Sequence, residues 1–504
     1  MKNKSLVALS ITILLIPSLN GFSQNGTKLI GYDAVTSGRG GTSTGTFDNP
    51  SLMVNNPAGI SFLKSSQMDI SFSLMAPSVY FKNNLNDSKG KSNLFPLGCI
   101  SYVKSGSKKI SYGFGIFTQG GMGADFTLNH YLFADETGKY NQQTYHSKFA
   151  VMQGVGTIAY KINNKLSIGV TAGIVYSQMA FQMPMSMPPS MLKGVINPQT
   201  GFNFGNMFSG APQSGGLGYT ELVAAANLSN LSAYEFNGKI GLAYQPSESL
   251  SFGISYSMPV NLNYKHGNAQ MDMNAQMNNA FAKVVAGVMQ QNPSYTPQQA
   301  KQSAMTQFSQ LGIDLNKGAS DSYSAKATLG LPQSLAAGFS IAATKRFRLS
   351  MDAEWVNWSK AFNVMNISLS GGSNANINRM VGTNGTITMP FPLDWKDAVV
   401  IRTGAEFSAS KTVVLRCGYA YGSNPVPEST VFPVFPAVVI HHASLGGSLK
   451  LSKSVFLNAA YEHAFRNDEN AAQNSLIGIQ FNSSKSGLSN DIYHVSVSIY
   501  LNKK

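Results

Sequence analysis

The amino-acid sequence predicts an all-β protein: an antiparallel transmembrane barrel of about fourteen strands in a bacterial outer membrane. Three observations support this fold class: an N-terminal export signal, a low charge without long apolar runs afterwards, and connections that alternate between short and long. Only 12% of the residues are charged, about half of the ~25% usual in soluble domains. Outer-membrane barrels have this composition because their apolar residues alternate with polar ones.

Residues 1–23 are typical of a secretory signal peptide. Lys2 and Lys4 precede the apolar stretch 6–16, and small residues lead to a cleavage point after Ser23. The apolar stretch is shorter than the ~20 residues that a membrane-spanning helix needs. We therefore expect the mature protein to be exported from the cytoplasm.

Residues 24–65 are predicted to form a plug, or hatch, in the lumen of the barrel. The central part, 37–60, is polar and rich in glycine, and it shows no sustained helical or strand period. Such a segment has too little apolar surface to offset the entropy of ordering it, so it would need an enclosing structure to fold. The alternative on the same residues is a disordered periplasmic tail.

Residues 66–504 are predicted to form the barrel wall, because alternating or aromatic-rich segments recur there at hairpin spacing. We expect strands at 67–81, 94–104, 109–119, 147–161, 166–181, 234–246, 249–264, 332–344, 347–360, 397–409, 412–422, 441–451, 454–466 and 491–502. The connections between them alternate in length, with long ones such as 182–233 and 265–331. Short periplasmic turns and long extracellular loops are typical of outer-membrane barrels.

The strand phase predicts which charges point into the lumen. Along 347–356, apolar residues share one face and charged residues share the other. A basic residue facing lipid costs ~2–4 kcal/mol at the bilayer midplane, so the charged faces must point inward. This argument places five residues inside: Asp352, Glu354, Arg402, Glu406 and Arg416. Two interpretations remain open, a charge ladder that braces wall and hatch, or ligand binding through Arg402 and Arg416.

The long connection 182–233 begins with an unusual run of methionine and proline, in which Phe181, Met183, Met185 and Met187 alternate with smaller residues. Methionine is flexible and polarizable, which suits surfaces that bind varied apolar shapes. We interpret this run as an exposed, ligand-binding part of the barrel mouth. Packing against neighbouring loops is the alternative.

The connection 265–331 contains two predicted helices. The first, near 274–290, has an apolar stripe that includes Phe281. The second begins at Thr296, which forms a capping-box pattern with Gln299. The apolar faces of both helices could cover the mouth and share a ligand groove with the methionine run.

Glycines cluster where the third predicted strand, 109–119, is expected to end. Gly120, Gly121 and Gly123 predict a bulge or kink. In a barrel wall, a kink can open a side window, so these glycines are a candidate lateral gate. A flexible start of a loop explains the same spacing.

Other classes of function find little support in the sequence. The net charge of +14 is scattered, and no phosphate loop, zinc pattern or nucleic-acid motif is present. Cys99 and Cys417 are predicted to be two unpaired, buried thiols, with a disulfide in the periplasm as the alternative, and their separation is unlike a metal site. His441, His442 and His463 have no nucleophile that could be assigned to them. We expect no enzyme activity and no cofactor.

The hatch carries the most specific similarity to a known family. Asn56, Pro57 and Ala58, preceded by Asn55, resemble the Asn-Pro-Ala signature of the FadL/TodX family of outer-membrane transporters, and Arg39 lies in a stretch that resembles the upstream hatch. Shorter matches follow in the same order as in the family, at 331–333, 355–359, 394–397, 402–407 and 424–427. The chain departs from the family in its non-aromatic end and its longer insert at 265–331.

The resemblance implies a fourteen-stranded barrel with a hatch, a kinked third strand that gives a lateral exit, and a tighter apolar pocket near the hatch. It also implies a low-affinity groove between the loops 182–233 and 265–331. The implied function is uptake of a hydrophobic small molecule, a long-chain fatty acid or a hydrocarbon, by a monomer that releases it into outer-membrane lipid. A non-selective porin or a structural barrel is the alternative.

Overall fold

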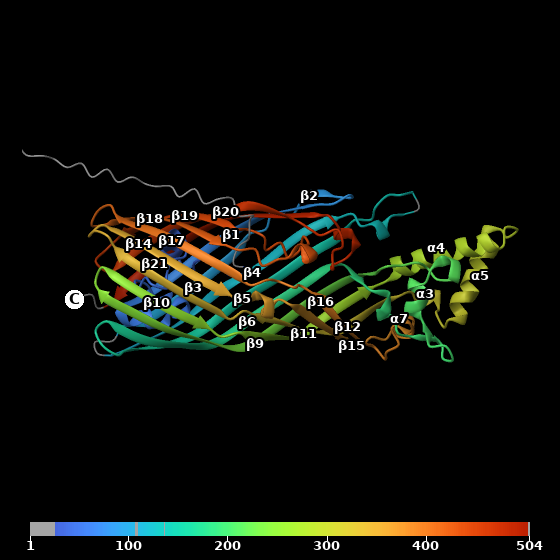
Figure 1. Ribbon diagram of the computed structural model, residues 1–504, viewed down its shortest axis with the longest axis horizontal. Coiled ribbons are helices and arrows are strands. Elements are labelled where there is room, and N and C mark those ends of the chain that lie inside the picture. Colours follow the sequence, from blue (N-terminus) through green and yellow to red (C-terminus); the bar gives the residue numbers. More distant parts are fainter. Residues whose placement is uncertain (1–25, 106–108, 136, 502–504) are drawn as a thin grey trace, which may run out of the picture.

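A computed structural model describes residues 26–105, 109–135 and 137–501 of the chain. The predicted signal peptide, 1–23, lies outside these residues. The wall is a closed antiparallel barrel of 14 strands (Figure 1), as the sequence predicts. The first and last strands close it, in register from Ser66 opposite Leu501 to Lys82 opposite Lys485.

Ten wall strands run without a break. These are β1 (Ser66–Lys82), β3 (Phe95–Lys104), β4 (Ile110–Leu128), β5 (Gln143–Lys161), β6 (Leu166–Met187), β9 (Leu222–Ser247), β18 (Val413–Gly422), β19 (His441–Lys450), β20 (Val455–Asn470) and β21 (Lys485–Leu501). Short strands outside this series are β2 (Asp87–Lys89), which pairs with β1, and the isolated pair β7 (Val195–Asn197) and β8 (Phe202–Asn203).

Four wall strands are each interrupted once, so that each consists of two pieces. The pieces are β10 (Leu250–Ser257) with β11 (Val260–Asp272), β12 (Ser320–Leu331) with β13 (Ser334–Ala342), β14 (Phe347–Val356) with β15 (Val364–Ser370), and β16 (Thr386–Pro392) with β17 (Ala398–Ser408).

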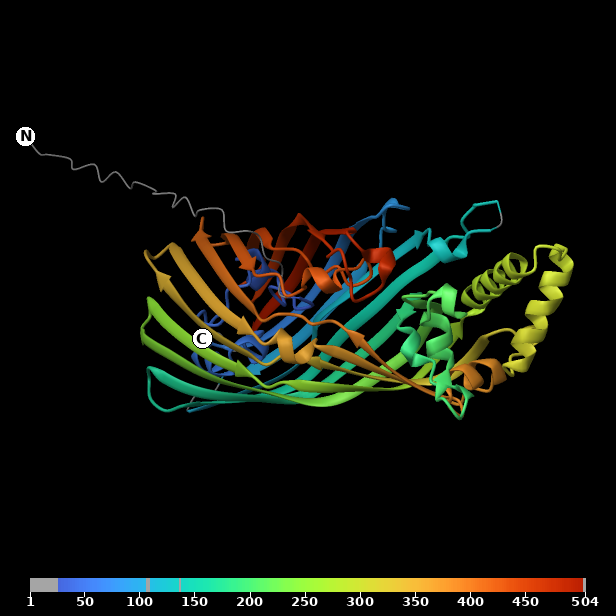
Figure 2. The same cartoon turned by 45° about the vertical axis from the view of Figure 1, so that its right-hand side comes forward.

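The helices lie at the two ends of the barrel. The lumen holds α1 (Ala34–Gly38), α2 (Leu52–Asn55) and the 3-10 helix η1 (Pro57–Phe62), and the opposite end carries α3 (Phe204–Ser209), α4 (Asn274–Gln291), α5 (Pro297–Gln310) and α7 (Ala375–Val381). A further short helix, α6 (Trp358–Ala361), follows β14. Figure 2 shows α4 and α5 as a hairpin that projects beyond the wall. No helix in the described part of the chain is long and apolar enough to cross a membrane.

The capping box predicted at Thr296 is confirmed. Its side chain accepts a hydrogen bond from the Gln299 backbone N–H, while Gln299 Oε1 accepts one from the Thr296 N–H at 2.8 Å. After α5 ends at Gln310, the chain turns back to β12, which begins at Ser320. The predicted insert is therefore a helical hairpin at the extracellular mouth.

Several predicted strand ends are wrong, because the wall is taller than expected on one side. β6 continues to Met187 and β9 begins at Leu222, so both ends of the expected loop 182–233 are strand. Likewise β4 passes its glycines and continues to Leu128. Figure 1 shows these strands extending further toward the helices than β18 and β19 do.

The two pieces of the interrupted strands have opposite polarity. In each pair, the piece farther from the helical hairpin is called the lower piece and the piece nearer to it the upper piece. The lower piece β10 exposes Phe252 and Ile254 on the outside and buries Ser251 and Ser255 inside. The upper pieces reverse this pattern. β11 exposes Asn261, Asn268 and Gln270 and buries Leu262, Tyr264 and Met271, and β12 exposes serines and buries Tyr323, Ala325 and Leu329.

The change of polarity marks the outer edge of the membrane. Only lipid makes an apolar exterior favourable, so the lower pieces lie in the bilayer and the upper pieces stand in water. Exposed aromatic side chains lie near both edges of the apolar belt, where interfacial aromatics are expected. The lower group contains Tyr112, Tyr160 and Tyr244, and the upper group contains Tyr234, Trp355, Tyr419, Tyr461 and Tyr493.

This boundary predicts opposite outcomes for one substitution at two heights. Ile254→Lys, in the belt, should cost about 2–4 kcal/mol of unfolding free energy, because it puts a charge in the lipid. Gln270→Lys, on the upper piece of the same strand, should change it by less than about 0.5 kcal/mol. Denaturant titration of barrels folded into lipid vesicles measures both values. Equal costs would contradict the boundary.

Candidate functional site

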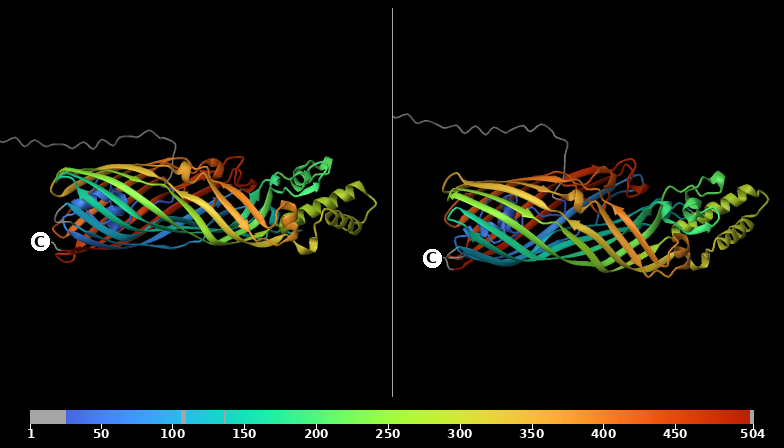
Figure 3. Two further views of the ribbon diagram at one scale, coloured as in Figure 1. Left: turned by 90° about the horizontal axis from the view of Figure 1, so that it is seen from below. Right: turned by 60° about the horizontal axis from the view of Figure 1, so that its bottom comes forward.

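Residues 26–65 fold inside the lower, membrane-embedded part of the barrel. Figure 3 shows this segment in blue, enclosed by the wall at the end that carries the C-terminus. Polar side chains cap two of its short helices, α1 and η1. Asp33 accepts hydrogen bonds from the N–H groups of Val35 and Thr36 at 2.8 and 2.9 Å, and Asn56 precedes Pro57 at the start of η1.

Asn56 fastens the hatch to the wall. Its Nδ2 donates to the carbonyls of Thr44 and Leu242, at 2.9 and 3.0 Å, and its Oδ1 accepts from the Ala58 N–H at 3.3 Å. A side chain at Gly241 would meet Asn56 Oδ1 at 2.2 Å from its Cβ, so the wall needs glycine at that point. The Asn-Pro-Ala segment is thus a structural pin between hatch and β9.

Arg39 is the centre of a first ion network between hatch and wall. Its terminal nitrogens donate to both oxygens of Asp48, at 2.5 and 2.9 Å, although its side chain is fully enclosed. Arg348 lies 3.4 Å from Asp48. Glu406 bridges two arginines, because its carboxylate lies 3.6 Å from Arg348 and 2.8 Å from Arg416. Burial acts to raise the pKa of Asp48, but the attraction of Arg39 outweighs it and holds that pKa below its ordinary value.

A second network lies higher in the lumen. Glu354 accepts from Lys28 of the hatch and from Arg402, the latter at 2.8 Å. Asp352 accepts from the backbone N–H groups of Ser43 and Thr44, at 2.7 and 2.8 Å.

The inward direction predicted for the charged strand faces is therefore confirmed. Arg402 and Arg416 each have a carboxylate partner, Glu354 and Glu406 respectively. These contacts fit the interpretation as a brace between wall and hatch. Neither arginine lines a cavity described below.

The wall opens beside the glycine cluster. The β3–β4 ladder ends at Cys99 opposite Phe117, and β4 has a bulge between Thr118 and Gly120, as the glycines predict. Above this point β5 is the wall strand that pairs with β4, and the Thr118 hydroxyl bonds the Gly98 backbone in place of a ladder to β3. Further up, the Lys91 N–H donates to the Asp125 carbonyl at 2.8 Å. The two wall strands separate there.

A cavity of about 410 Å3 occupies this opening. Its lining includes outward-facing residues such as Pro96 and Met152 as well as lumen residues such as Phe149 and Lys28, so it passes through the wall. Most of the lining is apolar, and it contains Gly120, Gly121, Met122 and Gly123. A hydrophobic molecule in this cavity would touch both the lumen and the surrounding lipid.

The hatch begins at the same opening. The Gly121 N–H donates to the Thr27 carbonyl at 3.1 Å, and the Leu29 N–H donates to the Gln119 carbonyl at 3.4 Å. Gly120 has φ of +154°, and its Cβ would lie 2.0 Å from the Thr27 carbonyl oxygen. Gly120 therefore cannot carry a side chain unless the start of the hatch moves.

A smaller cavity, of about 70 Å3, lies between hatch and wall beside Lys28, Lys239 and Trp358. The Lys239 Nζ donates to the Asn55 carbonyl at 3.4 Å. Asn55 thus contacts the wall next to the Asn56 pin. Below this level the lumen is filled by the hatch and its ion networks.

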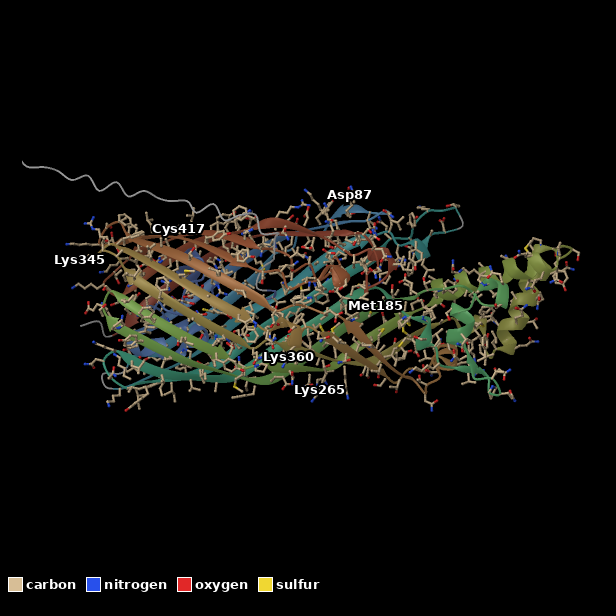
Figure 4. The ribbon with its side chains drawn as sticks, viewed as in Figure 1. Asp87, Met185, Lys265, Lys345, Lys360 and Cys417 are labelled. Atoms are coloured by element: carbon tan, nitrogen blue, oxygen red, sulfur yellow. The ribbon has the colours of Figure 1, made fainter. Side chains whose placement is uncertain are left out.

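The methionine run has a different environment from the expected one. Met183, Met185 and Met187 lie on β6 and point into the upper bore, together with Phe181, and Met183 and Met185 are each only 1% exposed. Figure 4 labels Met185 in the half of the barrel that is nearer to the helical hairpin, on the right of the view. The prediction of an exposed loop is wrong because this part of the wall has its apolar side inward.

Phe281 also packs against protein. Its ring lies 5.7 Å from that of Phe308, which joins α4 to α5, and Gln276 of α4 accepts from the Val223 N–H at 3.0 Å. The apolar faces of the helices are thus packed against each other and against β9. A ligand groove between the helices and the methionine run stays a prediction.

The sequence interpretation missed the connection 423–440, which folds into the bore. Phe432, Val434, Phe435 and Val439 are all nearly fully buried. Ser147 Oγ donates to the Val434 carbonyl at 2.5 Å. The signal was present in the sequence: residues 431–440 are almost entirely apolar, which is unusual for a loop in water.

The remaining candidates are a metal site and the two cysteines, Cys99 and Cys417. Among the residues that the structure describes, no three of His, Cys, Asp or Glu are grouped as metal ligands. Cys99 and Cys417 are both free, as predicted, but only Cys99 is buried, whereas Cys417 faces outward.

Comparisons with known proteins agree with this architecture. A sequence model described as "Outer membrane protein transport protein (OMPP1/FadL/TodX)" matches residues 20–498. Sequence comparison with curated proteins gives no match.

Several solved structures are similar to the chain. The Pseudomonas putida toluene transporter TodX has 17% identity and a TM-score of 0.66, covering 95% of this chain and 100% of that one. A Pseudomonas aeruginosa FadL homologue has 14% identity and a TM-score of 0.65, covering 94% and 99%. The Ralstonia pickettii toluene transporter TbuX has 16% identity and a TM-score of 0.60, also covering 94% and 99%. At these identities the likeness shows the fold alone.

The first ion network predicts that Arg39→Ala loosens the hatch. The substitution removes the main partner of the Asp48 carboxylate, which is 24% exposed and keeps Arg348 at 3.4 Å, and this loss should cost about 1.5–3 kcal/mol. Hydrogen exchange of the amides of 33–60 measures this loss. The control is Arg466→Ala, which removes an exposed pair with Asp468 and should cost at most ~1 kcal/mol. Unchanged exchange in Arg39→Ala would exclude the bracing role.

Proposed function

The chain belongs to the OMPP1/FadL/TodX family of outer-membrane transport proteins, and from this premise we propose that it takes up hydrophobic compounds and releases them sideways into the membrane. The compounds would be long-chain fatty acids or hydrocarbons. One observation carries the proposal: an apolar upper bore leads to an apolar cavity that passes through the wall between β3 and β4.

The distribution of polarity supports a sideways exit over a vertical one. Below the cavity, the lumen contains the hatch, with Arg39, Glu354 and Arg402 buried in ion pairs and Asp48 half-buried beside Arg39. An apolar molecule that moved down would have to displace these hydrogen-bonded charges. Moving sideways, it enters lipid and keeps the ~0.8 kcal/mol that each buried CH2 contributes.

The proposed route has three parts. The ligand is captured at the extracellular end, near the helices that include Phe281. It then passes along the bore beside Phe181, Met183, Met185 and Met187, where flexible methionines can adapt to its shape. It reaches the window at Gly120, Gly121 and Gly123, next to the start of the hatch, and leaves into lipid. One chain forms all of these parts, so we propose that a monomer suffices.

The cavity supports ligands of moderate size. Its volume of about 410 Å3 exceeds the roughly 150 Å3 of a cavity that holds benzene. Two cations, Lys28 and Lys148, line it. Lys28 is paired with Glu354, as Arg402 is, and Arg416 is paired with Glu406. For a ligand with an acid group Lys148 is therefore the better placed cation, because its Nζ donates to the neutral amide of Gln178.

Blocking the window should stop uptake. Gly120→Val puts a side chain against the Thr27 carbonyl and into the cavity, so uptake of a radiolabelled hydrophobic compound by cells should fall at least about tenfold. Gly154→Val is the matched control, because its Cβ would meet nothing within 4 Å. Full uptake by a folded Gly120→Val barrel would eliminate the lateral step.

The alternative function, a non-selective porin, predicts a steady ion current. The enclosed hatch and filled upper bore instead predict that single barrels in planar bilayers conduct almost no ions. Arg39→Ala provides a positive comparison, since a loosened hatch should admit current. A large, steady conductance of the unmodified protein would favour the porin.

A further inference from the structure

An aromatic layer crosses the bore above the window. Seven phenylalanine rings from separate parts of the chain are in contact: Phe81 of β1, Phe126 of β4, Phe181 of β6, Phe391 of β16, Phe432 and Phe435 of the connection 423–440, and Phe481 near β21. Each of them is buried. The contacts run from the β1–β4 side of the wall to the β6–β16 side.

Phe432 and Phe435 occupy the middle of this layer. Phe435 stacks on Phe181 with ring centroids 5.6 Å apart, and Phe432 lies 5.6 Å from Phe391 and 6.0 Å from Phe481. The two rings also touch each other, at 5.3 Å. Both come from the connection 423–440, so one segment closes the layer across the bore.

This segment separates the upper bore from the window. Pro436 and Ala437, which follow Phe435 directly, line the 410 Å3 cavity. On the other side of the rings, Phe181 is followed along β6 by Met183 and Met185 of the upper bore. A ligand that travels from the mouth to the window must therefore pass Phe432 and Phe435.

We propose that the connection 423–440 is an internal gate, in which Phe432 and Phe435 set the cross-section of ligands that reach the window. This inference rests on the proposed uptake function. It identifies the residues that select ligands by width, apart from the window and the hatch.

The bonding of the segment suits a gate. Proline at 433 and 436 removes backbone donors, so these residues cannot join a wall ladder. Hydrogen bonds hold the first part of the connection in place, among them the Thr430 hydroxyl to the Leu393 carbonyl and the Lys396 N–H to the Pro425 carbonyl. The apolar part, 431–439, is bonded to the wall by Ser147 at the Val434 carbonyl and by Asn467 at the Val438 carbonyl. Apolar packing supplies the rest, and it is non-directional, so the surface of a hydrophobic ligand can replace it.

A reversible cross-link tests whether the segment must move. Ser147→Cys with Val434→Cys, in a Cys99→Ser and Cys417→Ser background, is designed to join the gate to β5 by a disulfide, because Ser147 touches the Val434 carbonyl. Mass spectrometry of the alkylated protein selects the preparations in which the bond has formed. We expect uptake of a radiolabelled fatty acid to fall by about tenfold or more, because a fixed segment keeps Phe432 and Phe435 across the bore, and to recover on reduction. The single cysteine variants are controls.

The outcomes separate the gate from the proposed function. If the unmodified barrel shows no uptake of the fatty acid or of toluene, the proposed function fails. If it transports and the oxidised double variant transports equally well, the gate is wrong while the function stands. Heat-modified mobility in gels confirms in each case that the barrel is folded.

A substitution tests selection by width. Phe435→Ala should raise uptake of a branched or polycyclic hydrocarbon about tenfold relative to a straight-chain acid. A hydrophobic pocket discriminates between ligands that differ by one methylene by about this factor or more. Phe435→Leu, which keeps most of the volume, should change the ratio little. Phe252→Ala, on the lipid face, is a second control. An unchanged ratio in Phe435→Ala would refute a role in selection.

Discussion

The free energy of placing polar groups next to lipid is the constraint on which this structure depends. In the bilayer the wall must be apolar outside, so its polar and charged side chains point into the lumen. Above the bilayer the same wall stands in water, and the two faces exchange roles. The reversal between β10 and β11 shows both states on one strand, with Ile254 outside below the break and Leu262 inside above it.

This reversal divides the interior into two chambers of different chemistry. The lower chamber is polar, and a polar hatch fills it, fixed by Arg39 with Asp48 and by Arg402 with Glu354. The upper chamber is apolar and belongs to the main hydrophobic core. The opening between β3 and β4 lies where the two chambers meet, next to a small apolar cluster of hatch and wall that includes Met53, Phe117 and Val155. The proposed sideways exit follows from this position, because the charged part of the lower chamber would oppose the descent of a hydrophobic molecule.

The opening depends on the hatch as much as on the wall. β4 loses β3 as a partner above Phe117, and the backbone around Thr27 takes over part of that edge. The bulge at Gly120 admits the Thr27 carbonyl, which a side chain would exclude. Window and hatch are thus one structural unit, and a movement of either changes the other. The connection 423–440 completes this arrangement from above, because it borders the same cavity.

The sequence alone determined the features that follow from local periodicity. Alternation predicted the barrel and the inward direction of Arg402 and Arg416, glycine spacing predicted the bulge in β4, and the Thr296–Gln299 pair predicted the start of α5. The predictions of strand faces succeed because the pleat of a strand fixes which residues share a face. The prediction of the helix start succeeds because a capping box forms between residues close together in the sequence.

The tertiary structure decided where the strands end and what fills the bore. Alternation continues through Met183 and Met185 into the upper wall, so periodicity contains no signal for the height at which the apolar side turns from lipid to lumen. The burial of 431–440 depends on rings contributed by β6, by β16 and by Phe481, which no local pattern brings together. The physical reason is the same in both cases: the solvent that a side chain meets is set by the closed barrel, and neighbouring residues do not reveal it.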